Sequence, residues 1–257
     1  MSDGEVHCTV TDGIASVVFD RPAARNAMTW TMYDGLARAC REIAENPQVR
    51  VATFRGTGGE AFVAGTDIAQ FTEFTAEDGL RYEVHISASI ERIETLTKPT
   101  IAAVEGWCTG GGLIIASACD FRIATPGAKF GVPIARTLGN CISVANVARL
   151  IAAFGQARAK RILMLAEMVT AEEAATLGFV HTVAAPEELD RTLAAMCARL
   201  KGHAPLTMYA SKEAMRRLLT HHLPDDEDLV RICYGSTDFK EGISAFLGKR
   251  KPNWTGQ

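Results

Sequence analysis

The residues with the clearest chemical potential in this 257-residue sequence offer backbone groups rather than side chains. Gly110, Gly111 and Gly112 follow an apolar run that ends at Val104 and precede a second apolar run that begins at Leu113. Glycine permits backbone conformations and a close ligand approach that a side chain would block. The first amides of a helix lack partners within the helix, and the helix dipole makes that end positive. We interpret the glycines as a site for a developing negative charge, although a tight turn packed in the core would carry the same residues.

A second glycine lies in a short loop that could supply another backbone donor. Residues 61–68 read AFVAGTDI, so Gly65 follows an apolar run. Gly65 lets the chain turn sharply, and the amide of Thr66 then opens a short helical turn that Asp67 can cap. An ordinary loop before a helix would have the same composition. Two such amides would stabilise an oxyanion, the charge that develops on a carbonyl oxygen during acyl chemistry.

Side chains on a helix predicted at residues 76–96 could add acid or base chemistry. Tyr82, Glu83 and His85 lie close together, and the tyrosine and the histidine are three residues apart, so they can share a helix face. Histidine supplies a group that titrates near neutral pH. From the sequence we prefer solvated surface positions for Tyr82 and His85. Cys108, just before the three glycines, has no base nearby and is predicted to be a small buried residue.

The segments that must position these residues alternate between strands and helices. Asp12 and Gly13 separate two β-prone runs within residues 6–19, which predicts a hairpin. Strands are predicted at residues 49–56, 100–104, 120–124 and 179–183. Helices are predicted from residue 29 or 31 to about 46, and at residues 76–96, 145–154, 158–166, 171–177, 187–200, 205–219 and 225–246.

The composition limits the classes of partner. Hydrophobic residues make up 47% and charged residues 22% of the chain, which leaves ample material for a core. The formal net charge of −3 gives no basic excess, so we expect no nucleic-acid partner. No apolar run approaches the roughly 20 residues that span a bilayer, and the first residues form no signal core, so we expect a cytoplasmic protein with no membrane contact. Seven cysteines without a CxxC pair fit a reducing compartment and argue against disulfides or a zinc site.

Seven segments, in order and over nearly the full length, resemble the crotonase superfamily, also called the enoyl-CoA hydratase/isomerase family. They are DRPAARNAM (20–28), AFVAGTDI (61–68), KPTIAAVEGWCTGGG (98–112), ACDFRIA (118–124), KFGVP (129–133), AEEAATLGFV (171–180) and KEGISAFLGKRKPNW (240–254). The resemblance implies an α/β fold, a crotonase-like spiral of ββα units with a C-terminal helical trimerisation region. Residues 1–200 would form the spiral core and residues 201–257 the C-terminal helical region of the same domain. The implied assembly is a homotrimer or a dimer of trimers.

The resemblance also assigns roles to the two glycine segments. The amides of Thr66 and Gly111 would form an oxyanion hole for the carbonyl oxygen of an acyl-CoA thioester. The residues that would border the CoA moiety are Arg25, Ala27, Ala64, Ile68 and Lys249. A solvated charged end would explain the basic tail around Lys249 equally well. Coenzyme A enters as part of the substrate, and neither another cofactor nor a metal is expected.

The sequence departs from the family where a typical hydratase carries two glutamates. The corresponding positions hold Ile114, in GGGLIIAS, and Ile134, in FGVPIART. Two carboxylates there would activate a water and protonate the α-carbon, and isoleucine can do neither. The loop that follows also differs from the family. Its polar residues are Arg136, Asn140, Cys141 and Ser143.

Three functions remain open from the sequence. The first, preferred on the resemblance, is an enzyme that processes acyl-CoA thioesters through an enolate, with Tyr82, His85 or Arg136 as candidate acid or base groups. The second is an acyl-CoA-binding homologue without chemistry. The third is a decarboxylase, isomerase or thioesterase on the same fold. Loss of CO2 itself yields the enolate, and Arg136 or His85 could pair with the anionic substrate of a decarboxylase.

Overall fold

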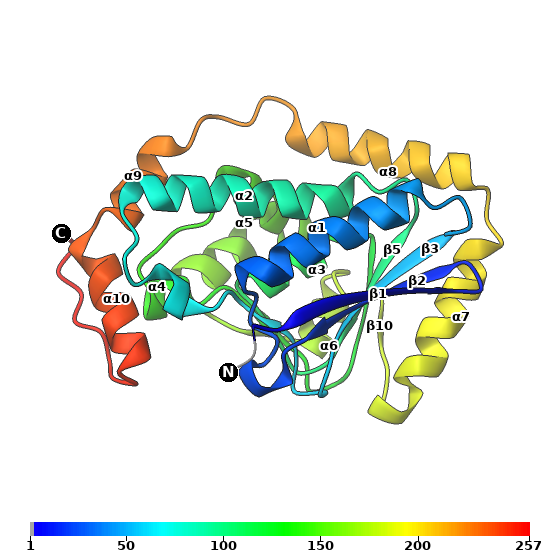
Figure 1. Ribbon diagram of the computed structural model, residues 1–257, viewed down its shortest axis with the longest axis horizontal. Coiled ribbons are helices and arrows are strands. Elements are labelled where there is room, and N and C mark those ends of the chain that lie inside the picture. The colour runs from blue at the N-terminus through cyan, green and yellow to red at the C-terminus, as the bar shows by residue number, and fades with distance from the viewer. Residues whose placement is uncertain (1–2) are drawn as a thin grey trace.

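The computed structural model describes residues 3–257, and its larger sheet runs through the body of the molecule (Figure 1). Six strands lie in the order β1-β2-β3-β5-β7-β10. Their bounds are β1 Glu5–Thr11, β2 Ile14–Asp20, β3 Val51–Gly56, β5 Thr100–Val104, β7 Phe121–Ala124 and β10 Thr182–Val183. β1 and β2 pair antiparallel, and the other neighbours pair parallel. The predicted hairpin is confirmed, since Asp12 and Gly13 turn the chain with φ of 50° and 75°.

Four short strands form a second sheet, in the order β4-β6-β8-β9. Their bounds are β4 Ala61–Ala64, β6 Trp107–Thr109, β8 Lys129–Gly131 and β9 Val169–Thr170. The chain visits the two sheets in turn, through β3 and β4, then β5 and β6, then β7 and β8. The helices that follow these pairs are α2 Ala76–Glu94, α3 Gly111–Ala118 and α4 Ile134–Thr137. This repetition is the predicted spiral of ββα units, and it brings the residues after the parallel strands β4, β6 and β8 to one edge.

The remaining elements complete the layers around the sheets. They are α1 Trp30–Glu45, α5 Val144–Met164, α6 Ala171–Thr176, α7 Leu189–Lys201, α8 Pro205–Thr220, α9 Glu227–Tyr234, α10 Thr237–Leu247, and the short 3-10 helices η1 Pro22–Ala24, η2 Ile68–Phe71 and η3 Pro186–Glu188. The single helix predicted at residues 225–246 was wrong, because Ser236 caps a new helix and separates α9 from α10. The two helices predicted at residues 145–154 and 158–166 are confirmed, because α5 is interrupted at Gly155, whose φ of 71° and ψ of 157° are not helical. The strand predicted at residues 179–183 shortens to β10, because amides at its start bond back to α6.

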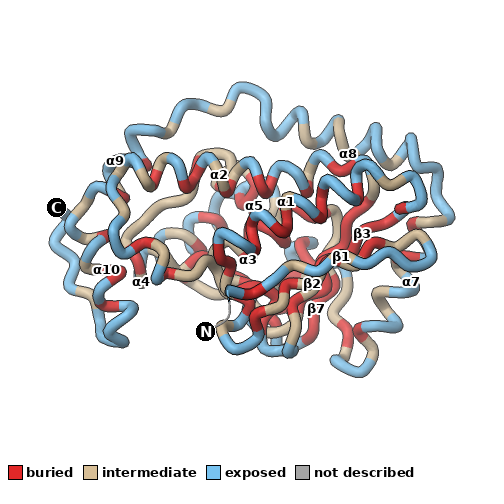
Figure 2. The backbone as a smooth tube through the Cα atoms, in the orientation of Figure 1, coloured by how far each residue is buried: buried red, intermediate tan, exposed pale blue. Residues whose placement is uncertain are grey.

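Helix α2 joins the core to the C-terminal helices. It packs against α1, α3 and α9. Figure 1 places α9 and α10 at one end of the molecule and α7 at the opposite end. Figure 2 shows the buried backbone concentrated in the strands and on the inner faces of α1, α2 and α3, whereas α8 has no buried residue. The apolar side chains of Leu206, Met215 and Leu218 on α8 are exposed.

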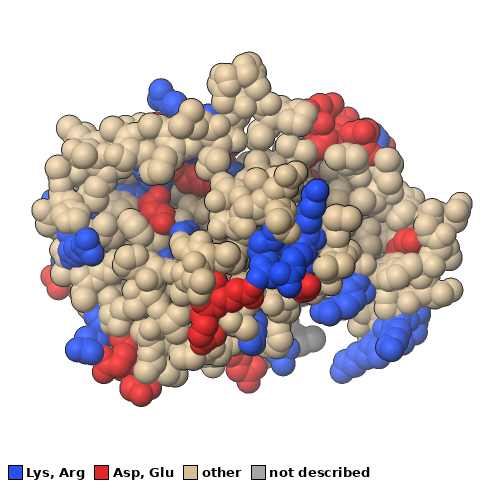
Figure 3. Space-filling view, turned by 180° about the vertical axis from the view of Figure 1, so that it is seen from behind, with Lys and Arg blue, Asp and Glu red and all other residues tan. Residues whose placement is uncertain are grey.

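The surface carries both signs of charge. On the face in Figure 3, Lys and Arg side chains lie among Asp and Glu side chains rather than forming one basic surface. Within residues 3–257, no helix combines the length and the apolar character needed to cross a membrane.

Candidate functional site

The two glycine loops predicted to carry backbone donors lie against each other. Strands β4 and β6 are parallel neighbours, with Ala64 opposite Thr109, so the chain leaves both strands at the same edge. Gly65 and Gly110 then adopt φ of 84° and 55°, a region that favours glycine. A Cβ atom on Gly110 would lie 3.3 Å from the Cα atom of Gly65. The close packing of the loops therefore depends on these two glycines.

The loops leave two amides available for a ligand. Met28 bonds to the carbonyl of Gly65 and to the amide of Asp67, each at 2.9 Å, and so holds the backbone on both sides of Thr66. Within the described chain, the Thr66 amide itself has no acceptor. Gly111 is the first residue of α3, where an amide has no acceptor within its helix. A Cβ atom on Gly111 would lie 3.7 Å from the Thr66 hydroxyl, so the two residues are adjacent.

Both amides border a cavity of about 820 Å³. All of the residues predicted to border CoA also line it: Arg25, Ala27, Ala64, Ile68 and Lys249. A smaller cavity of about 340 Å³ lies at α7 and α8, away from the glycine loops. Within residues 3–257, no group of three His, Cys, Asp or Glu side chains is placed to hold a metal ion. The larger cavity is the candidate site, because both free amides and the residues predicted to border CoA line it.

The structure places Tyr82 in the cavity wall rather than on the solvated surface that we preferred. Its side chain is buried, and its hydroxyl lies 2.7 Å from the hydroxyl of Thr66. The Thr66 hydroxyl also lies 2.8 Å from the hydroxyl of Tyr33. Burial raises the pKa of Tyr33 to about 12 and the pKa of Tyr82 well above its ordinary value, so both phenols stay protonated. The two phenols fix the side chain of Thr66 beside its free amide.

His85 and Arg136 are not brought to the cavity. His85 shares a face of α2 with Tyr82, as predicted, and both rings pack on Trp30, at centroid distances of 5.2 and 5.7 Å. The Nε2 atom of His85 lies 3.9 Å from a carboxylate oxygen of Asp34, beyond hydrogen-bond distance. Arg136 is exposed on α4. Neither side chain lines the wall that contains the two amides.

Two isoleucines make part of the cavity wall apolar. Ile114 lies on α3, one turn after Gly111, and Ile134 begins α4. Both line the cavity, together with Ile86 and Leu138. Cys108 is fully buried behind this wall, and burial raises the pKa of its thiol well above the ordinary value. Its predicted role as a small buried residue agrees with this environment.

One carboxyl in this apolar region was assigned no role by the sequence. Glu83 is 5% exposed and lines the same cavity. One carboxylate oxygen accepts a hydrogen bond from the hydroxyl of Tyr234, and the other accepts one from the amide of Ser143, both at 2.9 Å. Glu83 is therefore a buried side chain of α2. The signal was present in the spacing, because residues 83, 86 and 90 form the buried stripe of α2.

The environment of Glu83 pulls its protonation equilibrium in two directions. Burial is the largest effect and disfavours the charged form, while the hydrogen bonds from Tyr234 and Ser143 favour it. A smaller upward contribution comes from the negative charge of Asp226. The outcome is a pKa of about 7. Glu83 therefore differs from a surface glutamate in being able to hold or release a proton near neutral pH.

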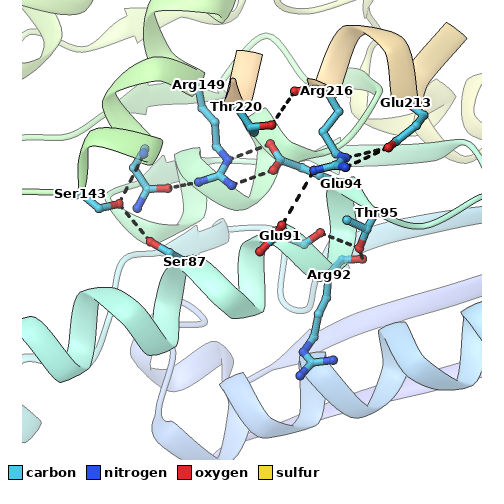
Figure 4. Close-up of polar contacts among 11 residues, drawn as sticks. Ser87, Glu91, Arg92, Glu94, Thr95, Ser143, Arg149, Glu213, Arg216 and Thr220 are labelled. Carbon is cyan, nitrogen blue, oxygen red and sulfur yellow. Dashed lines mark hydrogen bonds and ion pairs between the residues drawn. The ribbon is translucent and has the colours of Figure 1, made fainter. Parts of the chain in front are cut away.

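A polar network fixes the backbone that bonds to Glu83 (Figure 4). The hydroxyl of Ser143 accepts from the amide of Asn146 and caps α5, and it lies 3.0 Å from the hydroxyl of Ser87, one turn after Glu83 on α2. Further along α5, two guanidinium nitrogens of Arg149 donate to the two carboxylate oxygens of Glu94 on α2, each at 2.7 Å. Arg149 also donates to the side-chain oxygen of Asn146. These contacts attach the start of α5 to α2. The amide of Ser143 is thereby held in place beside the carboxylate.

Comparisons with known proteins identify the family of the chain. The sequence profile of the enoyl-CoA hydratase/isomerase family matches residues 9–257. Crotonyl-CoA hydratase of Syntrophomonas wolfei is 33% identical over 245 residues, which cover 94% of each chain. A structure of methylmalonyl-CoA decarboxylase in complex with 2-nitronate-propionyl-CoA superposes with a TM-score of 0.90 at 27% identity, covering 98% of this chain and 99% of the other. An enoyl-CoA hydratase/carnitine racemase from Magnetospirillum magneticum has a TM-score of 0.80 at 31% identity, covering 100% and 97% of the two chains. The chain therefore belongs to the enoyl-CoA hydratase/isomerase family of enzymes, within the crotonase superfamily.

Proposed function

We propose that this protein binds an acyl-CoA thioester with its carbonyl oxygen between the amides of Thr66 and Gly111. The observation that carries the proposal is the pairing of these two amides at the edge of the larger cavity. When an enolate forms, negative charge moves to the thioester oxygen, and fixed amides stabilise that charge without reorganising. Loss of one such donor typically lowers kcat by about 10²–10³-fold.

The charge distribution along the cavity supports one direction for the substrate. Arg25 and Lys249 line the end formed by η1 and the C-terminal segment, where they can meet the phosphates of CoA. Ile114 and Ile134 line the region beyond the amides, where the acyl chain would lie. The apolar wall favours a hydrocarbon acyl group near the thioester.

A matched pair of variants at Gly111 tests the role of its amide. Gly111→Pro removes the N–H group at the first helical position, where proline is tolerated. Gly111→Ala keeps the N–H group and places a Cβ atom in the same space, 2.9 Å from the hydroxyl of Tyr33. We expect turnover or exchange of acyl-CoA substrates to fall at least about 100-fold further in the proline variant than in the alanine variant. Equal activities in two folded variants would contradict the proposal.

The names of the relatives suggest the first substrates. Crotonyl-CoA, from the hydratase relative, can be followed by the absorbance of its conjugated thioester, with the product identified by mass. Gain of one water would assign hydration. Binding without a product, for crotonyl-CoA and a panel of other thioesters, would favour the acyl-CoA-binding homologue.

Decarboxylation is a second candidate, favoured by the similarity to methylmalonyl-CoA decarboxylase and by the two isoleucines. Loss of CO2 yields the enolate without a base. The cations that we considered for an anionic substrate, His85 and Arg136, do not line the cavity. Release of CO2 from methylmalonyl-CoA would assign this reaction, and its absence would remove that substrate.

We also propose a homotrimer or a dimer of trimers in the cytoplasm. The exposed apolar side chains on α8 and α9, among them Leu218 and Ile232, suit a surface that is covered by another copy. Seven unpaired cysteines suit a reducing compartment. Light scattering coupled to gel filtration measures the assembly directly.

A further inference from the structure

Three carboxyl groups line the candidate cavity within residues 3–257, and two of them are committed to arginines. Glu60 lies on the CoA side with its side chain largely exposed, 3.7 Å from Arg25. Asp67 is paired with Arg21 at 2.7 Å and caps η2. Glu83 is paired with no cation in the described chain. We therefore assign Glu83 to the part of the cavity where the acyl chain would lie.

The partners of Glu83 hold its carboxylate while leaving it able to accept a proton. Each oxygen accepts one hydrogen bond, from Tyr234 and from the amide of Ser143, and a carboxylate has about four lone-pair sites. Glu83 follows Tyr82, whose hydroxyl contacts Thr66 beside one of the two free amides. Glu83, Tyr82 and the residues that carry the two amides all line the same cavity.

We propose that Glu83 is the catalytic group that takes a proton from the α-carbon of the acyl thioester and returns it. This inference rests on the proposed function, since it requires the thioester oxygen to lie at the amides of Thr66 and Gly111. It also assigns to α2 the chemistry that Ile114 and Ile134 cannot perform.

The step balances without a further reactant. The carboxylate of Glu83 forms an O–H bond as the α-carbon loses its C–H bond. The electron pair of that bond forms the carbon–carbon double bond of the enolate, and the π electrons of the carbonyl move to its oxygen. The amides of Thr66 and Gly111 stabilise that oxygen. In reverse, the protonated carboxyl returns its proton to the carbon and the carbonyl re-forms.

Tyr234 is a positioning residue in this scheme. Its hydroxyl donates to Glu83 and accepts from the side-chain amide of Asn140 at 3.2 Å, so it favours the charged carboxylate. Several titratable groups act on Glu83 from the elements packed around it. They are Asp226 before α9, and Cys233 and Tyr234 on α9. Glu83 in turn raises the pKa of Tyr33 on α1, of Tyr82 on α2 and of Cys141 in the loop before α5.

Exchange of α-hydrogen for deuterium isolates the proton-transfer step from any later reaction. Wild-type protein is mixed with butyryl-CoA in D2O, and the deuterium content of the thioester is followed by mass spectrometry. We expect exchange above the rate without protein, rising with pH through about 7 because the base form must be charged. Glu83→Gln should lower the rate at least about 100-fold, while the dissociation constant of butyryl-CoA changes less than about threefold.

Two further variants control the experiment. Glu91→Gln makes the same change on the same helix at a side chain that is 57% exposed, and it should exchange like wild type. Tyr234→Phe removes a hydrogen bond that lowers the pKa of Glu83, so it should move the midpoint of the pH profile upward. This shift tests the proposal even if Glu83→Gln fails to fold.

The outcomes separate the inference from the proposed function. Exchange at the wild-type rate in a folded Glu83→Gln variant would overturn the role of Glu83, as would an unchanged midpoint in Tyr234→Phe. Wild-type protein that binds butyryl-CoA without exchanging it would also overturn that role and leave thioester binding intact. Wild-type protein that neither binds nor exchanges any thioester would instead refute the proposed function.

Discussion

Relative to wild type, the stability of a Glu83→Gln variant should increase as the pH rises. Burial raises the pKa of Glu83 from its ordinary value of 4.5 to about 7. Because the folded state holds this proton more tightly than the unfolded state, wild-type stability is fully present below about pH 4.5 and falls as the pH rises through about 7. Glutamine resembles the protonated side chain in shape and is neutral at every pH. The glutamine variant therefore lacks the loss of stability that wild type shows as Glu83 ionises.

The size of the effect follows from the two pKa values. Each pH unit between them is worth about 1.4 kcal/mol, so the step from 4.5 to about 7 corresponds to roughly 3 kcal/mol. The free energy of unfolding of Glu83→Gln, minus that of wild type, should therefore increase by about this amount between pH 4 and pH 8. All other titrating groups are common to the two proteins and largely cancel in the difference.

Urea denaturation at a fixed protein concentration, repeated at half-unit steps of pH, measures this difference. A fixed concentration matters because assembly contributes to apparent stability. Glu91→Gln, on the exposed side of α2, should show no comparable dependence on pH. A flat difference for Glu83→Gln, or one that declines as the pH rises, would refute the argument that Glu83 is a buried carboxyl with a raised pKa.

Three other substitutions have effects that follow from single contacts. Gly112→Ala would place a Cβ atom 2.0 Å from the carbonyl oxygen of Val63, so it should destabilise the fold by about 3 kcal/mol, and an unchanged thermal midpoint would contradict this packing. Arg149→Met removes the partner of the Glu94 carboxylate, whose side chain is 15% exposed, and should cost about 3 kcal/mol by urea denaturation, whereas a cost below about 1 kcal/mol would show that the pair is solvated. Lys249→Ala should raise the KM for acyl-CoA several-fold at low salt with little change in kcat, and a KM effect that does not shrink as salt is added would argue against a phosphate contact.

Local sequence signals predicted the elements that carry the backbone donors. Asp12 and Gly13 specify a hairpin because both residues tolerate positive φ, and the structure has that hairpin. The glycines at 65 and 110 marked sharp turns after short strands, and both turns have positive φ. Such features depend on a few neighbouring residues, so the order of residue types is enough to predict them.

Glu83 was missed because its environment is assembled from distant segments. Its hydrogen-bond donor Tyr234 lies 151 residues further along the chain, and the amide of Ser143 lies 60 residues further along. Helical spacing places residues 83, 86 and 90 on one face, but it does not reveal whether a polar member of that face meets water or a partner. The break between α9 and α10 had a similar cause, since Ser236 acts as a cap only where the chain turns. Tertiary contacts decided both features.

The two isoleucines and the buried glutamate form one electrostatic arrangement. Carboxylates at positions 114 and 134 would place like charges in the cavity of Glu83 and raise its pKa further, leaving it protonated at neutral pH. Isoleucine removes that repulsion and excludes water, so burial sets the upward shift while Tyr234 and the amide of Ser143 limit it. A pKa of about 7 populates both protonation states near neutral pH, which suits a group that both takes and returns a proton. Isoleucine at positions 114 and 134 is therefore weak evidence against chemistry in this cavity, because the cavity contains a carboxyl on another helix.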